Sequence, residues 1–223
     1  MKFDAVIVAA GSSTRFGNED KLSADLCGRP VLAWSLAAFE AIEGLGCLVI
    51  VTGVDSVPAV TALAERWCPK VCFRVIEGGA RRRDSVEAGL RECTSRYVAI
   101  HDGARPMLTP ELLGQVLSAA AGRPGAIAAT PVTDTIKEVS NGVISGHPER
   151  SRLWAAHTPQ VVLRQAWLDA AAMSDNDETD DAAMLSRLGL ECAVVDAGAD
   201  NLKITRPADL EVAAAILRAR GAL

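Results

Sequence analysis

The sequence is poor in aromatic residues, which are 4% of its 223 residues, and it has no excess of positive charge. Its formal net charge is −5, so we expect no nucleic-acid partner, and any anion must be bound by a local group of cations. Long apolar runs are missing too, since no stretch reaches membrane-spanning length and no signal-peptide cleavage pattern appears. These absences predict a soluble, cytoplasmic protein without a membrane partner.

Metal-binding patterns are equally scarce. The chain has three histidines, and its six cysteines are scattered without a C-x-x-C pair, which argues against a structural zinc site. We therefore expect reduced and mostly buried cysteines at all six positions: Cys27, Cys47, Cys68, Cys72, Cys93 and Cys192.

What the chain does contain is apolar sequence, 49% of the total, arranged in alternating strand-like and helix-like segments. Strand-like runs cover residues 47–51, 71–76, 97–100, 125–132 and 192–195, and helical patterns cover 31–39, 57–67, 86–92, 112–121, 164–173, 182–188 and 207–220. Such alternation with short connections predicts an α/β fold with a doubly wound, mostly parallel, Rossmann-like sheet. The length suits one domain over residues 1–223.

One segment breaks this alternation. Residues 133–139 and 143–145 alternate apolar and polar side chains on either side of Asn141-Gly142, the strongest short-range signal for a β-hairpin. An isolated hairpin is marginal in water. We therefore expect an arm at about residues 134–150 that packs on a second subunit and makes a homodimer.

The first apolar run ends in a loop suited to a polyphosphate. Ala9, Ala10 and Gly11 are small enough to admit a ligand to the backbone, hydroxyl donors follow at Ser12, Ser13 and Thr14, and the loop carries the cations Arg15 and Lys21. A Walker loop is excluded because Gly11 and Gly17 enclose five residues and Asn18 follows. A dinucleotide fingerprint is excluded because Ser13 stands at its second glycine and no acid ends the next strand. The remaining alternative is an ordinary strand-to-helix turn.

Two further strand ends carry polar residues. In residues 77–85, Gly78 and Gly79 permit close approach, Asp84 or Ser85 can cap the helix at 86–92, and three arginines form either a ligand site or a solvated surface. Asp102 follows the next strand, where it could hold Mg²⁺ against phosphates or cap the backbone. The acids of residues 175–181 are interpreted as a solvated helix start.

Assembled, these motifs resemble the 2-C-methyl-D-erythritol 4-phosphate cytidylyltransferases over nearly the whole chain. The motifs that carry the resemblance are Ala9-Ala10-Gly11 with Arg15 and Lys21, Gly78-Gly79 with Asp84-Ser85-Val86, residues 101–106 (HDGARP), Pro131-Val132 with Asp134-Thr135, Thr158-Pro159-Gln160, Thr179-Asp180, and residues 200–207 (DNLKITRP). The resemblance implies a Mg²⁺-dependent transfer of CMP from CTP to methylerythritol phosphate with release of pyrophosphate.

The resemblance also implies roles for individual residues. Arg15 and Lys21 neutralise the α-phosphate, and Arg150 and Lys203 are the other catalytic cations. The acceptor is held by Thr135, Arg150, Thr179, Asp200 and Lys203, with the arm acting across a dimer. Asp102 and Asp200 are the metal carboxylates. The nucleotide contacts are Ala9, Ala10, Gly11, Ser12 and Ser13 at the triphosphate, Gly79, Asp84 and Ser85 around cytosine, and Asp102, Gly103, Ala104 and Arg105.

The chain departs from the family pattern at Asp20-Lys21-Leu22, where the family has Pro-Lys-Gln, and at Thr133, where some relatives carry a cation. The residues alone indicate a Mg²⁺-dependent nucleotidyl or phosphoryl transferase, whereas the base and acceptor come from the resemblance. Three alternatives differ from the main hypothesis: a cytidylyltransferase for another polyol phosphate such as ribitol 5-phosphate, a regulatory module that binds nucleotide without turnover, and a dehydrogenase, which the missing fingerprint disfavours.

Overall fold

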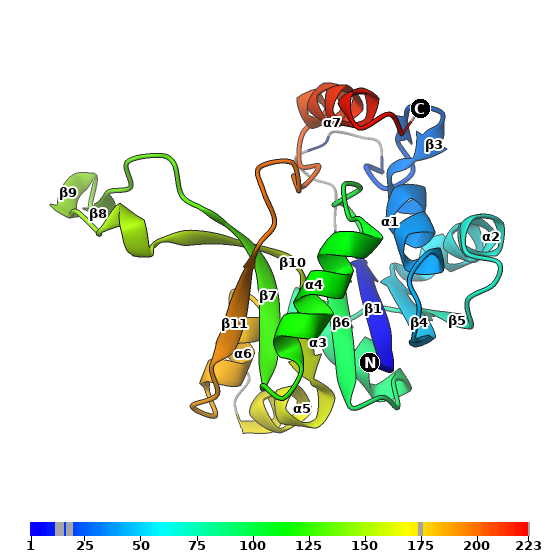
Figure 1. The fold of residues 1–223 in the computed structure, drawn as a ribbon, viewed down its shortest axis with the longest axis horizontal. Helices are drawn as coiled ribbons and strands as arrows, with labels where there is room; N and C mark the ends of the chain where they lie inside the picture. Colours follow the sequence, from blue (N-terminus) through cyan, green and yellow to red (C-terminus); the bar gives the residue numbers. More distant parts are fainter. Residues whose placement is uncertain (12–15, 17–19, 174–175, 223) are drawn as a thin grey trace.

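The computed structural model describes residues 1–11, 16, 20–173 and 176–222. Its centre is a sheet of seven strands in the order β11-β7-β10-β6-β1-β4-β5, in which only β10 runs antiparallel to its neighbours (Figure 1). This confirms the predicted doubly wound, mostly parallel α/β fold. The strands are β1 Phe3–Ala9, β4 Leu45–Thr52, β5 Phe73–Glu77, β6 Tyr97–Asp102, β7 Gly125–Pro131, β10 Trp154–Leu163 and β11 Cys192–Asp196.

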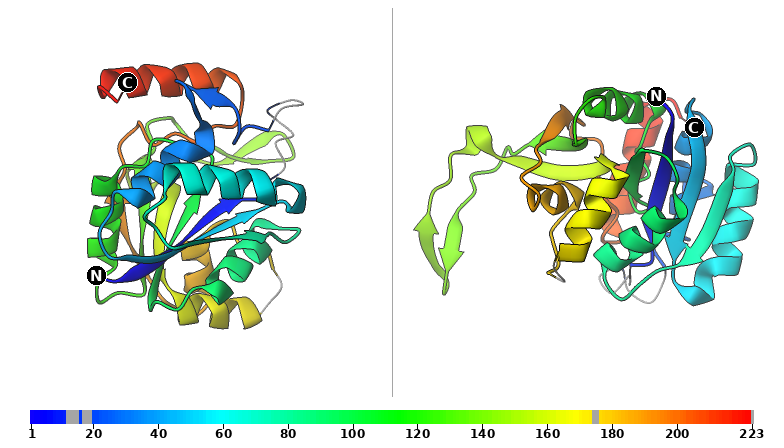
Figure 2. Two further views of the ribbon diagram at one scale, coloured as in Figure 1. Left: turned by 90° about the vertical axis from the view of Figure 1, so that its right-hand side faces the viewer. Right: turned by 90° about the horizontal axis from the view of Figure 1, so that it is seen from below.

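Helices cover both faces of this sheet (Figure 2). Alternate side chains of one strand enter different cores, because successive residues of a strand point to opposite faces. Ile7 packs in the core beneath α1, α2, α4 and α7, and Val6 packs in the core beneath α3, α5 and α6. The helices are α1 Val31–Glu40, α2 Val57–Trp67, α3 Arg82–Glu92, α4 Pro110–Ala120, α5 Arg164–Met173, α6 Asp181–Ser186 and α7 Ala208–Ala219.

Most predicted elements lie within a few residues of the observed ones, but the start of α3 was predicted wrongly. The helix begins at Arg82 and not at Val86, and its N-cap residue is Arg81. Asp84 lies in the first turn, where its Oδ2 accepts a hydrogen bond from the backbone N–H of Arg81 at 3.1 Å. Ser85 is buried in that turn and is not the cap residue. The reason is that a carboxylate three residues inside a helix can satisfy the N-cap backbone as well as a cap residue can.

The predicted hairpin is present between β7 and β10. Its two strands, β8 Glu138–Ser140 and β9 Val143–Gly146, pair antiparallel around Asn141 and Gly142, both at positive φ. Residues 133–137, which were expected in the first strand, instead lead out from β7. The hairpin extends well beyond the body of the molecule (Figure 1), and β7 and β10 stay paired as far as Pro131 and Trp154 at its base.

Strand register brings the ends of the parallel strands together. Val8 is aligned with Asp102 on one side of β1, and Ala9 is aligned with Thr52 on the other. Asp102 is the last residue of β6 and not a loop residue as predicted. The two predicted loops and Asp102 therefore meet at one edge of the sheet, as the carboxyl ends of parallel strands must.

Two observations bear on the predictions from composition. All six cysteines are free, but only Cys68 and Cys93 are buried and Cys72 is exposed, so the expectation that most would be buried is wrong. Within the described ranges, no helix is long and apolar enough to cross a bilayer.

Candidate active site

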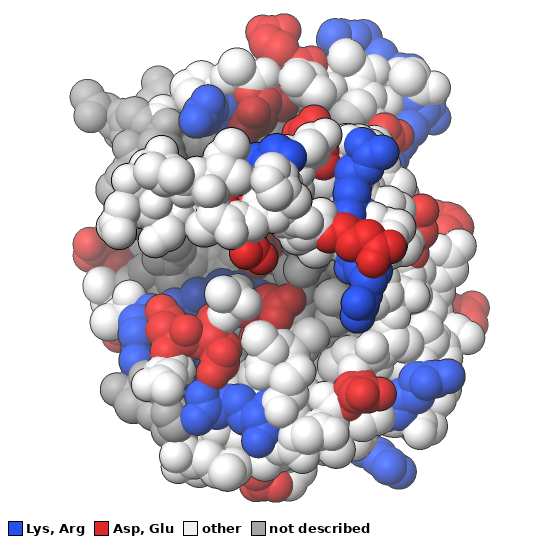
Figure 3. Space-filling model, turned by 90° about the vertical axis from the view of Figure 1, so that its left-hand side faces the viewer, with Lys and Arg blue, Asp and Glu red and all other residues white. Residues whose placement is uncertain are grey.

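The candidate site is a cleft of about 380 Å³ at the carboxyl edge of β1, β5 and β6. Figure 3 shows a face of the molecule on which acidic and basic side chains lie side by side around a hollow. The cleft brings together residues from four distant parts of the sequence. Its lining residues are Val8, Ala9, Ala10, Gly11, Lys21, Leu22, Gly79, Ala80, Arg81, Arg82, Ser85, Asp102, Ala104 and Lys203.

Small residues form one wall of the cleft because two backbone segments touch there. A Cβ atom built on Gly78 would lie 2.6 Å from the Ala10 Cβ and 2.7 Å from the Ser85 Oγ. Ser85 Oγ accepts a hydrogen bond from the Gly79 N–H at 3.1 Å and donates to the Arg81 carbonyl at 3.2 Å. The glycine turn and the start of α3 are thus tied together beside the end of β1.

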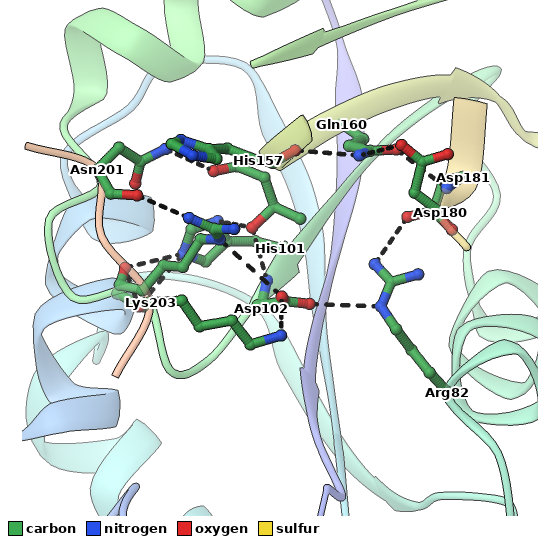
Figure 4. Close-up of polar contacts among 12 residues, drawn as sticks. Arg82, His101, Asp102, His157, Gln160, Asp180, Asp181, Asn201 and Lys203 are labelled. Carbon is green, nitrogen blue, oxygen red and sulfur yellow. Dashed lines mark hydrogen bonds and ion pairs between the residues drawn. The ribbon is translucent and has the colours of Figure 1, made fainter. Parts of the chain in front are cut away.

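Asp102 lies opposite this wall with cations on both sides. Its Oδ2 accepts a hydrogen bond from Lys203 Nζ at 2.6 Å, its Oδ1 lies 3.4 Å from Arg82 Nε, and Arg105 Nε is 4.0 Å from Oδ2 (Figure 4). Burial alone would raise the pKa of Asp102, but Arg82 and Lys203 oppose it and hold the pKa well below the usual range. Asp102 is therefore a carboxylate at neutral pH.

Behind Asp102 lies a buried pair of residues, Thr158 and His101. Thr158 Oγ1 accepts from the Asp102 N–H at 3.0 Å and contacts His101 Nδ1 at 3.1 Å. Burial lowers the pKa of His101 to about 4, so the ring is neutral at physiological pH. We interpret His101 and Thr158 as supports for the end of β6, since neither lines the cleft.

The segment that contains Lys203 is fixed through its neighbour Asn201. Asn201 is buried, its Nδ2 donates to the Thr158 carbonyl at 2.9 Å, and its own carbonyl accepts from Arg105 Nη1 at 2.7 Å. The Ile204 N–H donates to the Ala104 carbonyl at 2.8 Å. These contacts hold Lys203 over the cleft although it lies 101 residues from Asp102.

Several predicted residues lie at the cleft and others do not. Ala9, Ala10, Gly11, Lys21, Gly79, Ser85, Asp102, Ala104 and Lys203 line it. Gly103 and Arg105 lie directly behind it: the Gly103 N–H donates to the Val8 carbonyl at 3.0 Å, and Arg105 is buried. Asp84 does not line the cleft; it forms an ion pair with Arg81 at 2.7 Å, at the start of α3. Ser12, Ser13 and Arg15 lie outside the described residues.

The remaining predicted residues, all assigned to the acceptor, are exposed. Thr135 and Arg150 lie on the arm, where Arg150 Nη1 donates to the Thr133 carbonyl at 3.0 Å. Thr179 precedes α6. Asp200 accepts a hydrogen bond from Arg220 Nη2 at 3.3 Å and is not one of the residues that line the cleft.

Among the described residues that line the cleft, Asp102 carries the one carboxylate that could bind a magnesium ion. Mg²⁺ is usually held by one or two carboxylates together with substrate phosphates and water, and the Asp102 carboxylate fits that role. Within the described ranges, no group of three or more His, Cys, Asp or Glu side chains could hold a metal by itself. Among the described residues, the donor set therefore fits an ion that arrives with a polyphosphate.

Sequence reasoning missed Asp181 and its pairing with Arg82. Asp181 is 1% exposed, so the interpretation of residues 175–181 as a solvated helix start is wrong for this residue. Its Oδ2 accepts from Arg82 Nη2 at 2.8 Å. The available signals were the run of three arginines and the Thr179-Asp180 motif, but neither indicates that the two segments meet.

The ligand-site interpretation of the arginine run fits two of its residues, and the solvated-surface interpretation is wrong for the third. Arg81 and Arg82 line the cleft. Arg83 is buried and donates to the carbonyl of Ala171 at 3.0 Å and of Asn176 at 2.8 Å. It therefore joins α3 to the last turn of α5, as carbonyls left over at a helix C-terminus allow.

Comparison with known proteins agrees with this geometry. Residues 3–219 match the family model described as 2-C-methyl-D-erythritol 4-phosphate cytidylyltransferase. Proteins of that name from Synechococcus sp. (strain WH7803) and Prochlorococcus marinus (strain MIT 9313) are each 42% identical, over 96% of this chain and 99% and 98% of theirs. A crystal structure with the same name from Thermus thermophilus superposes with a TM-score of 0.80 at 29% identity, covering 98% of this chain and 100% of that one.

Proposed function

Because this chain belongs to the 2-C-methyl-D-erythritol 4-phosphate cytidylyltransferase family, we infer that it transfers CMP from CTP to 2-C-methyl-D-erythritol 4-phosphate. The products are 4-diphosphocytidyl-2-C-methyl-D-erythritol and pyrophosphate. The observation that supports this best is the cleft in which a wall of small residues faces Asp102 and Lys203.

We propose the following division of labour in the cleft. The backbone of Ala9, Ala10 and Gly11 holds the triphosphate, and the loop with Gly79 and Ser85 holds the base. The acceptor phosphate oxygen attacks the α-phosphorus in line, and pyrophosphate leaves with the electrons of the broken bond. Lys21, together with Arg15, stabilises the charge that develops on the α-phosphate.

The acceptor is proposed to bind on the other side of the attacked phosphorus. Lys203, Asp200 and Thr179 are the candidates from the same chain, and Asp200 must then exchange its contact with Arg220 for one with substrate. Lys203 is held at 2.6 Å from Asp102, which places its ammonium group at the cleft before the acceptor binds. Such preorganisation reduces the cost of fixing the acceptor phosphate.

We propose Mg²⁺ as the cofactor, with Asp102 as its protein ligand; Asp200 is the second candidate. When bound with CTP, Mg²⁺ would neutralise charge on the triphosphate and on the departing pyrophosphate. The test is pyrophosphate release in EDTA and after Mg²⁺ is added back. Turnover that persists in EDTA would contradict the proposal.

The substrate assignment is tested by an acceptor screen. Pyrophosphate release is followed with CTP, UTP or ATP and with methylerythritol phosphate or ribitol 5-phosphate. We expect turnover with CTP and methylerythritol phosphate. Turnover with ribitol 5-phosphate but none with methylerythritol phosphate would show a cytidylyltransferase of the other polyol-phosphate type, and CTP binding without any turnover would show a regulatory module.

We further propose a homodimer whose arms complete the active sites of their partners. The hairpin carries Val139, Val143 and Ile144, which are 62%, 68% and 54% exposed, and apolar surface of this kind favours a protein contact. Arg150 and Thr135 lie on the same arm, away from the cleft of their own chain. In a dimer with two-fold symmetry, both arms would make equivalent contacts.

Subunit complementation tests this directly. Arg150→Ala and Lys203→Ala should each be inactive as homodimers. If the arm acts across the dimer, a heterodimer of the two variants contains one intact site, so an equal mixture should regain about a quarter of wild-type activity. A mixture that stays inactive after subunit exchange has been demonstrated would refute the shared site.

We also propose that the reaction takes place in the cytoplasm. CTP and a polyol phosphate are both charged and do not cross a bilayer unaided. Cell fractionation with an activity assay tests this, and activity confined to the membrane or the periplasm would contradict it.

A further inference from the structure

Asp181 is a buried carboxylate that does not line the cleft and that accepts a hydrogen bond at each oxygen. It is 1% exposed and begins helix α6. Its Oδ1 accepts from the indole Nε1 of Trp167 at 3.1 Å, and its Oδ2 accepts from Arg82 Nη2 at 2.8 Å. A buried charge is costly unless it is paired and hydrogen-bonded, so this arrangement fixes Asp181 and requires Arg82 to stay beside it.

The backbone of Asp181 is fixed as firmly as its side chain. Gln160 of β10 is 1% exposed, and its Oε1 accepts from the N–H groups of Asp181 at 3.0 Å and Ala182 at 3.1 Å (Figure 4). The Gln160 Nε2 donates to Asp180 Oδ2 at 3.2 Å. Thus the Thr158-Pro159-Gln160 motif anchors the start of α6 to the central sheet.

Arg82 links this buried group to the cleft. Its guanidinium bonds Asp181 through Nη2 at 2.8 Å and approaches Asp102 Oδ1 through Nε at 3.4 Å. Both carboxylates raise the pKa of Arg82, and Asp181 has the larger effect. Since the shorter contact is to Asp181, Arg82 is held back against α6 and meets Asp102 at one oxygen only.

Acidic and basic side chains therefore alternate in the order Asp181, Arg82, Asp102 and Lys203. Lys203 contacts Oδ2 of Asp102 at 2.6 Å and Arg82 approaches Oδ1, so the carboxylate has a cation at each oxygen. Without Asp181, Arg82 would be free to pair with both oxygens of Asp102 in the bidentate geometry that arginine and carboxylate favour. That pairing would compete with Lys203 and turn Asp102 away from the substrate.

We propose that Asp181 is a positioning residue for the transfer reaction. It acts on Asp102 and Lys203 through Arg82. Trp167 and Gln160 in turn hold Asp181 in place. This inference rests on the proposed function, because it assigns no substrate of its own. Asp181 makes no contact with substrate, and its effect requires the Arg82 guanidinium.

A double-mutant cycle of Asp181→Asn and Arg82→Met tests this dependence. We expect Asp181→Asn to lower kcat by about ten- to a hundredfold, the scale of a displacement near 1 Å at the reacting groups. Its Kd for CTP from calorimetry should change by less than about threefold, because the glycine turn and the end of β1 are intact. In the Arg82→Met background, Asp181→Asn should cause no further loss of kcat.

Three comparisons separate positioning from a role in stability alone. Asp181→Glu restores the carboxylate and should recover part of kcat. The stoichiometry of CTP binding in the calorimetric titration gives the fraction of each variant that is folded. Trp167→Phe removes the indole N–H that donates to Asp181 and should lower kcat by about threefold. The indole N–H of Trp67 has no partner among the described residues, so Trp67→Phe should leave kcat unchanged. Glu87→Gln breaks the ion pair between Glu87 and Arg91 in α3, the helix that begins at Arg82, and should leave kcat unchanged.

The outcomes are distinguishable. Equal losses from Asp181→Asn with and without the Arg82 side chain would overturn the inference, and so would wild-type kcat in a folded Asp181→Asn protein. If Asp181→Asn does not fold, Trp167→Phe decides, since full activity in that variant refutes the inference. A wild-type protein that shows no turnover with CTP and methylerythritol phosphate would instead refute the proposed function.

Discussion

A single methyl group at Gly78 should damage the nucleotide side of the cleft. The Gly78 N–H donates to the Thr52 carbonyl at 2.8 Å, so the turn lies directly against β4. Its backbone is outside the positive-φ region that favours glycine, and the requirement is therefore for space. In Gly78→Ala, the new Cβ would meet the Ala10 Cβ at 2.6 Å and the Ser85 Oγ at 2.7 Å.

The size of the effect follows from these distances. Non-bonded carbon atoms prefer separations of about 3.5–4.0 Å, so Ala10 and the turn must move apart by about 1 Å. Overpacking of this kind costs about 1–3 kcal/mol, which lowers Tm by roughly 2–12 °C for a chain of this length. The same displacement separates the two segments proposed to hold CTP, and we expect kcat/KM for CTP to fall by about ten- to a hundredfold.

The assay is pyrophosphate release at varied CTP concentration, together with thermal unfolding. Gly114→Ala is the matched control, because Gly114 lies inside α4 and a Cβ there meets nothing within 4 Å. That variant should gain about 0.5–1 kcal/mol of stability without a change in kinetics. If folded Gly78→Ala retains kcat/KM within about twofold, the small-residue wall does not position the nucleotide.

Three further predictions concern other parts of the molecule. Lys21→Ala should lower kcat by about a hundredfold or more while CTP still binds by calorimetry, and unchanged turnover would remove Lys21 from the mechanism. Paired Val143→Lys and Ile144→Lys substitutions should give a folded, inactive monomer by light scattering; an active monomer would contradict the shared site. Asp4 accepts hydrogen bonds from the N–H groups of Cys47, Thr94 and Ser95, and although burial opposes this, they hold its pKa below 3.8. Asp4→Asn should therefore cost about 2 kcal/mol at neutral pH, and the difference from wild type in chemical denaturation should shrink as the pH falls below 3.8; a difference that does not vary with pH would contradict the role of the charge.

The helices and strands were predictable where a local pattern determines them. Helices α2 and α5 begin and end at the predicted residues, because their apolar spacing and flanking residues are sufficient. The end of β6 depends instead on partners elsewhere. Asp102 belongs to β6 because it is aligned with Val8 of β1, and its N–H has a buried acceptor in Thr158. No neighbouring residue in the sequence indicates either partner.

The same distinction applies to the candidate site. Loops at strand ends could be placed together from the sequence, because parallel strands bring their carboxyl ends to one edge. The long-range side-chain contacts could not: Arg82 donates to Asp181 across 99 positions, and the Asp4 carboxylate accepts from the backbone N–H of Ser95 across 91. In each case the acid is 1% exposed and is hydrogen-bonded to a distant segment, and hydropathy alone cannot distinguish such an acid from a solvated one.

Strand order explains why the pairs that do form converge on one cleft. Strand β1 has β4 on one side and β6 on the other, so the chain leaves β1 in one direction and later returns to its other side. Helix α3 makes that crossing, from β5 at the edge to β6, and packs against β1 and β4 on the way. Its first turn must therefore begin beside the crevice between β1 and β6, where open α/β sheets bind their ligands. Arg82 lies at the cleft because of this connection. From the start of α3 it can therefore link Asp181, on the face of the sheet covered by α5 and α6, to the carboxylate of Asp102 at the end of β6.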